Sequence, residues 1–168
     1  SGHSATFSGH KGTITNVGSV ANTFGSVVIK SGTTDVSGNY SITKANGTLK
    51  VTRATTATTG SCINPTYNGS GQTLASGASN ASYSNNSGTN ATSYTVTVTS
   101  GSNYAFSDGQ TSKTLSCSIG KRATTCTSGS SSRAYNGSAL TNTTGGSCTN
   151  LVSGHSATFS GHKGTITN

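Results

Sequence analysis

The sequence predicts an all-β protein, and three observations support this fold class. The 168 residues include no Glu, no Met and five Leu, so the residue types that favour helices are scarce. β-Branched and aromatic residues alternate with polar ones in several stretches, as they do along half-buried strands. Dipeptides that favour tight turns separate these stretches at short intervals.

Five stretches show the alternation expected of strands. In residues 94–99, Tyr94, Val96 and Val98 share one face and three Thr share the other. The other stretches are residues 24–30, 40–43 (with Tyr40 and Ile42 on one face), 49–52 (with Leu49 and Val51) and 114–119. Hairpin turns are predicted at Ser31-Gly32, Asn46-Gly47, Asn68-Gly69, Asp108-Gly109 and Asn136-Gly137. Short strands with turns about every eight to twelve residues indicate small β-sandwiches.

Two levels of repetition organise the chain. Residues 1–16 and 153–168 are identical, so the sequence returns after 152 residues. Within this period Arg53-Ala-Thr-Thr recurs at Arg122, an offset of 69, and Tyr67-Asn-Gly-Ser recurs at Tyr135, an offset of 68. We therefore expect a section of a longer tandem array with two kinds of module. Residues 53–121 form one complete module, residues 122–168 begin a second, and residues 1–52 are the C-terminal part of a module of that second kind.

The four cysteines fall two in each module. Three pairings are possible, and we prefer Cys62 with Cys117 and Cys126 with Cys148 because each bond then stays inside a module. Cys117 sits between Leu115 and Ile119 on the inward face of its strand. Disulfides closing loops of this size contribute about 3 to 4 kcal/mol each, and they indicate an oxidising, extracellular setting. Four reduced thiols are the alternative, and the spacing is unlike that of a zinc site.

Composition argues against several classes of protein. Apolar residues make up 29% of the chain and charged residues 7%, so only thin cores can form, yet the regular alternation favours strands over disorder. The net charge is +8, but the basic residues are spread along the chain, which argues against nucleic-acid binding and leaves a weak attraction to anionic cell surfaces or glycans. The longest aliphatic run is residues 27–29, so we expect no membrane insertion.

Catalytic and metal-binding patterns are not found. The two acids, Asp35 and Asp108, fall in different modules and are expected in turns, so we predict no enzyme, no catalytic residue and no cofactor. His3 and His10, repeated as His155 and His162, could bind a metal between copies, but we expect them to face solvent. An isopeptide bond is disfavoured because Lys30, Lys50 and Lys113 are expected to point outward. Eight Asn-x-Ser/Thr sequences could carry glycans: Asn39, Asn46, Asn68, Asn80, Asn85, Asn90, Asn136 and Asn142.

The order of several short motifs resembles a known family. Residues 135–138, 150–155 and 161–168, continued by residues 17–18, 38–43 and 47–52, look like the glycine-rich, mainly-β bacterial surface repeats of the MBG and YDG type. Residues 64–69, 72–74, 89–91, 94–98, 104–109 and 113–115 resemble a sister version, in which Ala91-Thr-Ser-Tyr94 departs from the more usual Gly before the Tyr strand. The resemblance implies Ig-like modules strung along very large secreted or wall-anchored proteins.

We therefore expect a structural repeat of an extracellular bacterial fibre, filament or giant surface adhesin that serves as stalk or sheath material. Its partners would be neighbouring copies of the same repeat. One alternative is an adhesin module that binds glycans or host surfaces through residues 79–90, where Tyr83 is the aromatic residue available. Another is a noncovalent filament whose subunits exchange strands, with the duplicated segment marking the junction.

Overall fold

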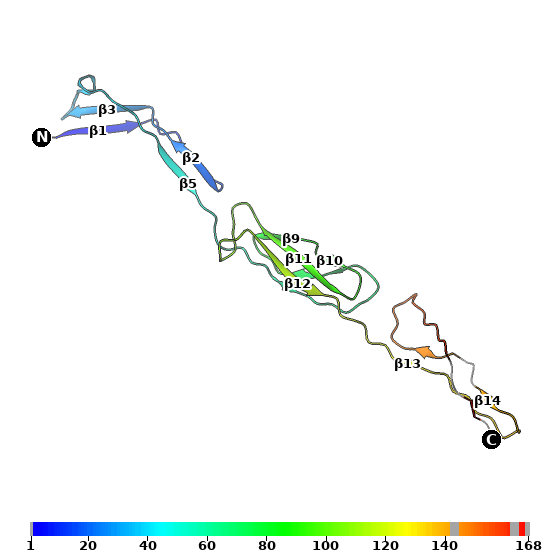
Figure 1. Cartoon of the computed structure of the whole chain (residues 1–168). Helices are drawn as coiled ribbons and strands as arrows, with labels where there is room; N and C mark the ends of the chain where they lie inside the picture. The colour runs from blue at the N-terminus through cyan, green and yellow to red at the C-terminus, as the bar shows by residue number, and fades with distance from the viewer. Residues whose placement is uncertain (1, 142–144, 162–164, 167–168) are drawn as a thin grey trace. The chain divides into compact units, whose positions relative to one another are not determined.

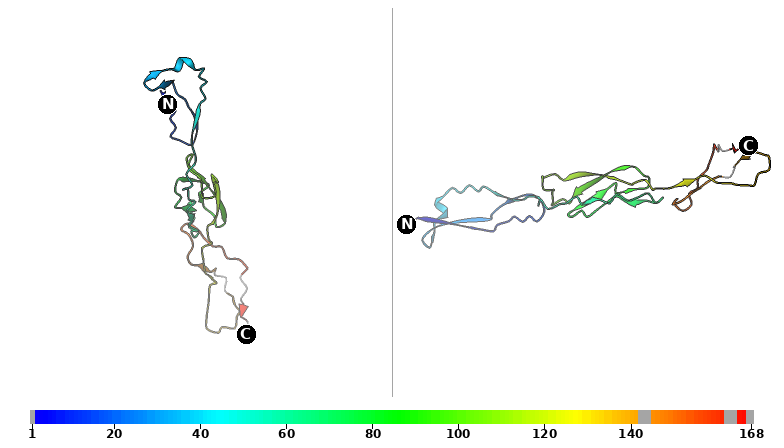
Figure 2. Two further views of the ribbon diagram at one scale, coloured as in Figure 1. Left: turned by 90° about the vertical axis from the view of Figure 1, so that its left-hand side faces the viewer. Right: turned by 90° about the horizontal axis from the view of Figure 1, so that it is seen from below.

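The computed structural model describes residues 2–141, 145–161 and 165–166 of the chain. Within these residues the fold is all-β, which confirms the predicted fold class. The other regular element in this part of the chain is the short 3-10 turn η1 (Ser37–Asn39), drawn as a cyan coil in Figure 2. The described strands form small sheets of two or three strands, and these sheets do not close. No helix among the described residues is long and apolar enough to cross a membrane.

The chain divides into two compact units, each drawn from several parts of the sequence. The first comprises Ser1–Gly60, Gly77–Ser84 and Val98–Lys113. The second comprises Ser61–Ser76, Asn85–Thr97 and Thr114–Asn168. The module boundaries that the repeats place before Arg53 and Arg122 stay a prediction.

Two antiparallel sheets in the first unit contain the strands nearest the N-terminus (Figure 1). β1 (His3–Ser8), β3 (Ser26–Ser31) and β4 (Thr34–Asp35) form one sheet in the order β1-β3-β4, and β2 (Gly18–Asn22) pairs with β5 (Gly47–Val51). β1 and β3 pair from His3 opposite Ser31 to Ser8 opposite Ser26. The strands predicted at residues 24–30 and 49–52 are therefore present, with somewhat different ends.

Two local predictions in this unit are wrong. Residues 40–43 form no strand, because the chain leaves η1 at Tyr40 and residues 41–46 have no regular structure. Alternation alone does not make a strand, since its N–H and C=O groups also need a neighbouring strand. The turn expected at Asn46-Gly47 is absent too, because Gly47 is the first residue of β5 and lies opposite Asn22.

β11 (Ser93–Ser100) is the central strand of a sheet with the order β12-β11-β9, flanked by β12 (Ser112–Ser118) and β9 (Ala81–Ser84). Val96 and Val98 on β11 are fully buried, as the alternation predicts. The buried apolar residues of the first unit are Ala57, Val98, Ala105 and Phe106, and those of the second are Leu74, Ala75, Val96, Cys117 and Ile119. Both cores are small, in keeping with the low apolar fraction of the chain.

The remaining strands of the second unit are pairs of two-residue strands. β6 (Ser61–Cys62) pairs with β8 (Ala75–Ser76), and β7 (Gln72–Thr73) pairs with β10 (Ser87–Gly88). β13 (Cys126–Thr127) pairs with β15 (Ser147–Cys148), and β14 (Leu140–Thr141) pairs with β16 (Thr165–Ile166). Pairs this short are marginal by themselves, so the second unit depends on additional links.

Two disulfides supply such links. Cys62 bonds to Cys117, with Cα atoms 5.3 Å apart, and Cys126 bonds to Cys148, with Cα atoms 4.0 Å apart. These are the two pairings preferred from the sequence. They close 55 and 22 residues of chain, for which loop-closure entropy gives about 4 and about 3 kcal/mol of stabilisation.

Three of the predicted turns share one geometry. In each, the side-chain oxygen of the first residue accepts a hydrogen bond from the backbone N–H two residues later, and the intervening Gly has a positive φ near 80°. The acceptors and donors are Asn68 and Ser70, Asp108 and Gln110, and Asn136 and Ser138. A residue with a Cβ is strained at such a φ, which explains the Gly at the second position.

Candidate functional site

Asp108 lies in a turn, as predicted, whereas Asp35 is the last residue of β4 and pairs with Lys30 of β3, so the turn predicted for it is wrong. Asp35 Oδ1 accepts a hydrogen bond from the Ser37 N–H at 2.9 Å, and hydrogen bonds from the Ser37 side chain and backbone lower the pKa of Asp35. The pKa of Asp108 is lowered chiefly by its hydrogen bond with Lys113 and further by the Gln110 N–H. Both carboxylates are therefore ionised at neutral pH, where they fix local backbone structure.

Lys113 does not point outward, contrary to the prediction. It precedes Leu115 by two residues and Cys117 by four, so it shares their inward face of β12. Its Nζ lies 2.8 Å from Asp108 Oδ2 and 5.4 Å from the centre of the Phe106 ring. The aliphatic stem of Lys can cover apolar surface while its ammonium group reaches a carboxylate, which explains this half-buried position. Lys30 and Lys50 are exposed, as predicted.

Two of the histidines contact tyrosines. His3 Nδ1 is hydrogen-bonded to the Tyr40 hydroxyl, and the two rings meet edge to face with centroids 5.9 Å apart. The His155 ring lies tilted against Tyr67 with centroids 6.0 Å apart. His10 is exposed, and His162 lies outside the described residues. In the described part of the chain, no three His, Cys, Asp or Glu side chains come together to hold a metal ion.

The loop considered for glycan binding keeps its aromatic residue turned inward. The Tyr83 hydroxyl donates to Thr59 O at 2.9 Å and accepts from the Ala78 N–H at 3.0 Å, so its polar group is already bonded. The described Asn-x-Ser/Thr acceptors are exposed, at Asn39, Asn46, Asn68, Asn80, Asn85, Asn90 and Asn136. Asn142 lies outside the described residues.

The two copies of the duplicated segment have different structures. Residues 3–8 form β1 and pair with β3, whereas residues 155–160, which have the same sequence, are in no strand. Phe7 packs edge to face on Phe24, with ring centroids 5.3 Å apart. Phe159 is half-buried beside Gly146, where an added Cβ would lie 2.8 Å from its ring. The first copy thus contacts residues that follow it in the sequence, and the second contacts residues that precede it.

Tyr67 lies at the predicted module boundary in the second unit. Its N–H donates to Gly120 O at 2.9 Å, two residues before Arg122. The Arg122 guanidinium donates to the backbone and side-chain oxygens of Asn150, both at 2.7 Å. A hollow of about 130 Å³ remains here, lined by Tyr67, Arg122, Thr124, Asn150, Leu151, Val152 and His155.

The first unit contains a larger hollow at the repeat-equivalent position, and no tyrosine lines it. Its volume is about 490 Å³, and it lies at the predicted boundary before Arg53. Arg53 and Thr55 in its wall are the repeat equivalents of Arg122 and Thr124. The rest of the lining is Val17, Gly18, Ser19, Lys50, Val51, Thr52, Ala105 and Gly109. The counterpart of Tyr67 in the repeat, Tyr135, is not part of this lining.

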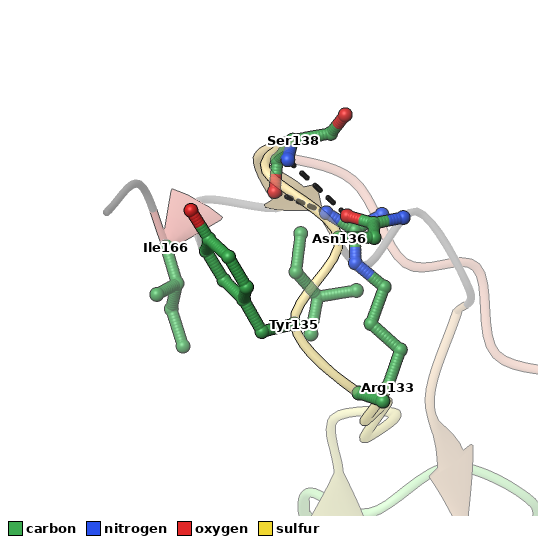
Figure 3. Close-up of a pocket in the computed structure, with 7 residues that line it drawn as sticks. Arg133, Tyr135, Asn136, Ser138 and Ile166 are labelled. Carbon is green, nitrogen blue, oxygen red and sulfur yellow. Dashed lines mark hydrogen bonds between the residues drawn. The ribbon is translucent and has the colours of Figure 1, made fainter.

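Tyr135 is instead among the most exposed large side chains described. It is 80% exposed, whereas its repeat equivalent Tyr67 is half-buried. Tyr135 borders a hollow of about 210 Å³ together with Arg133, Leu140 and Ile166. Figure 3 shows the side chains of Arg133, Tyr135 and Ile166 in this lining. Ile166 is 68% exposed.

No protein-family model, curated protein or solved structure matches the chain. The resemblance to MBG and YDG surface repeats stays a prediction.

Sequence reasoning identified Arg53, Tyr67, Arg122 and Tyr135 as repeat markers but did not identify them as parts of a site. The structure places the first three in the walls of hollows at the predicted module boundaries. The signal was present in the spacing, because Tyr-Asn-Gly-Ser follows Arg-Ala-Thr-Thr at nearly the same distance in both modules.

Proposed function

We propose that this chain is a structural repeat of an extracellular bacterial fibre, filament or giant surface adhesin, in which small β modules follow one another as stalk or sheath material. The observation that carries the proposal is that Arg53 and Thr55 line the hollow at one module boundary as Arg122 and Thr124 line the other. A chain that joins successive modules through the same residues is suited to repetition in series.

In this proposal each module is a small Ig-like sandwich that a disulfide holds together. Cores as small as these need such support, and disulfides persist in oxidising, extracellular surroundings. The function then resides in length and mechanical stability, with no catalytic residue and no cofactor. The partners are neighbouring copies of the same repeat.

Electron microscopy with antibodies raised against this chain tests the proposal. On intact cells of the source bacterium, we expect gold label on surface fibres at regular intervals set by the 152-residue period. Label confined to the cell interior would contradict it. Specific binding of the purified chain to a glycan array, without fibre labelling, would favour the alternative adhesin module.

A further inference from the structure

We infer that a second copy of this chain completes the module that residues 17–52 and residues 122–168 each form in part. In the complex, residues 155–160 of one copy replace β1 beside β3 of the second copy. Tyr135 of the first copy fills the hollow before Arg53 of the second. The inference rests on the proposed structural function and adds to it the partner and the residues of the joint.

The strand partner follows from the duplicated sequence. β3 pairs with β1 along six residues, and residues 155–160 have the sequence of β1 but no strand partner in the described part of the chain. In the complex His155 lies opposite Ser31, and Ser160 opposite Ser26, of the second copy. Because the incoming strand has the sequence of β1, the backbone hydrogen bonds lost between β1 and β3 equal those gained between residues 155–160 and β3. The free energy of exchange is therefore set by the other contacts between the copies and by the contacts that residues 155–160 lose, such as that of His155 with Tyr67.

The contacts of the two phenylalanines are compatible with one module. Phe159 rests beside Gly146 within its own copy, and Phe7 contacts Phe24 across the β1–β3 pair. Once residues 155–160 lie beside β3, Phe159 takes the place of Phe7 next to Phe24 and keeps its contact with Gly146. One ring then bridges the two parts of the module, which neither copy of the segment does in the isolated chain.

The tyrosine site follows from the smaller repeat. Tyr67 donates its N–H to Gly120 O, and Gly120 stands two residues before Arg122 as Val51 stands two before Arg53. β5, which contains Val51, pairs with β2 and has no second neighbour among the described strands. We therefore expect Tyr135 to donate its N–H to Val51 O of the second copy, with its ring in the hollow of about 490 Å³.

Exposed apolar surface is concentrated in the two partial modules. Among the described residues six large hydrophobic side chains are exposed, and of these Ile63 alone belongs to residues 53–121. The other five are Phe7, Tyr40 and Ile42 in residues 1–52, and Tyr135 and Ile166 in residues 122–168. This distribution is expected if each part lacks the surface that the other would cover.

Matched proline variants of the full chain test the strand exchange by sedimentation equilibrium. We expect the wild-type mass to rise above 16.6 kDa with concentration, because head-to-tail exchange leaves free ends. Ala157→Pro with Thr158→Pro removes one ladder donor from a segment that has no strand partner in the described part of the chain. This variant should keep the wild-type circular dichroism and stay monomeric. The same pair of changes at Ala5 and Thr6 should weaken β1 as a competitor and lower the concentration needed for assembly.

The chain contains no Trp, so Tyr135→Trp provides a single fluorescent reporter of the second contact. Its emission should move to shorter wavelength as the concentration rises through the assembly transition. Tyr135→Ala should weaken assembly about tenfold or more, as expected for a buried aromatic anchor. Ile63→Ala, which removes an exposed hydrophobic side chain within residues 53–121, is the control and should leave the assembly transition in place.

Several outcomes overturn the inference. A wild-type chain that stays monomeric at all concentrations, including one whose own residues 155–160 displace its own β1, contradicts exchange between copies. Assembly of the Ala157→Pro, Thr158→Pro variant at the wild-type concentration also contradicts it, as does a Tyr135→Trp emission that is unchanged on assembly. If cell-surface fibres are labelled while the purified chain stays monomeric, this joint is wrong and the proposed function stands. If the purified chain assembles but the antibodies label no cell-surface structure, the proposed function is wrong and this joint stands.

Discussion

Gly109 shows how strictly a single residue position is specified in this chain. It occupies the turn in which the Gly109 N–H donates to Phe106 O at 2.8 Å, with a φ of 82°. A Cβ added there meets no atom within 4 Å, so backbone strain alone opposes a side chain. We expect Gly109→Ala to lower the free energy of unfolding by about 1 to 2 kcal/mol, measured by urea denaturation.

Gly38 is the matched control for this strain. A Cβ added to Gly38 also meets no atom within 4 Å, but its φ is outside the left-handed region. Gly38→Ala should therefore change the free energy of unfolding by about 0.5 kcal/mol or less, or stabilise slightly by restricting the unfolded chain. Equal destabilisation by the two substitutions would contradict the role assigned to the positive φ of Gly109.

The ion pair between Asp108 and Lys113 makes a pH-dependent prediction. Because hydrogen bonding with Lys113 lowers the pKa of Asp108, its contribution to stability is complete above the ordinary Asp pKa of about 3.9 and is lost as the pH falls through the lowered value. Lys113→Gln should raise the pKa of Asp108 toward its ordinary value in an NMR titration. Asp35, whose pKa is lowered by Ser37, should titrate unchanged in the same variant.

At the scale of elements, the longer strands could be predicted from sequence and the two-residue strands could not. β11 and β12 have enough alternating positions to define an inward face, and Val96, Val98 and Cys117 are buried on it. Strands of two residues such as β13 and β15 are too short to show an alternating pattern. Their pairing, which the Cys126–Cys148 disulfide joins, defines them instead. Residues 40–43 show the converse failure, since they alternate without a neighbouring strand.

The candidate site was predictable in part for a related physical reason. The repeats specify which positions are equivalent, so Tyr67 and Tyr135 could be matched from sequence alone. Whether each tyrosine is covered depends on side chains brought together by folding, such as Val152 and His155 around Tyr67. No local pattern in the sequence carries that information.

Leu74 tests how much of the second unit depends on its small core. Its side chain is fully buried. Its backbone C=O accepts a hydrogen bond from the Ile63 N–H, and its backbone N–H donates one to Asn86 O. Leu74→Ala should therefore lower the free energy of unfolding by about 2 to 5 kcal/mol, the range for buried leucines. Ile63→Ala, at a side chain that is 48% exposed, should cost about 1 kcal/mol or less. Similar losses for both would mean that the core does not limit stability.

At the scale of the whole molecule, the two disulfides divide the chain into sections that do not overlap. One bond encloses residues 62–117 and the other residues 126–148. A chain of modules in series should respond to the loss of one bond only within the section that the bond encloses, because each module contacts only its neighbours. A single cooperative body would respond throughout.

Amide hydrogen exchange on two double variants distinguishes these cases. Cys126→Ala with Cys148→Ala removes about 3 kcal/mol of stabilisation and should leave the protection of Val96 and Val98 in β11 unchanged. Cys62→Ala with Cys117→Ala removes about 4 kcal/mol and should lower that protection, because Cys117 is buried on β12 beside β11. If loss of the Cys126–Cys148 bond also lowers protection in β11, stability is shared across the chain. The arrangement of modules in series is then wrong, even if both variants still fold.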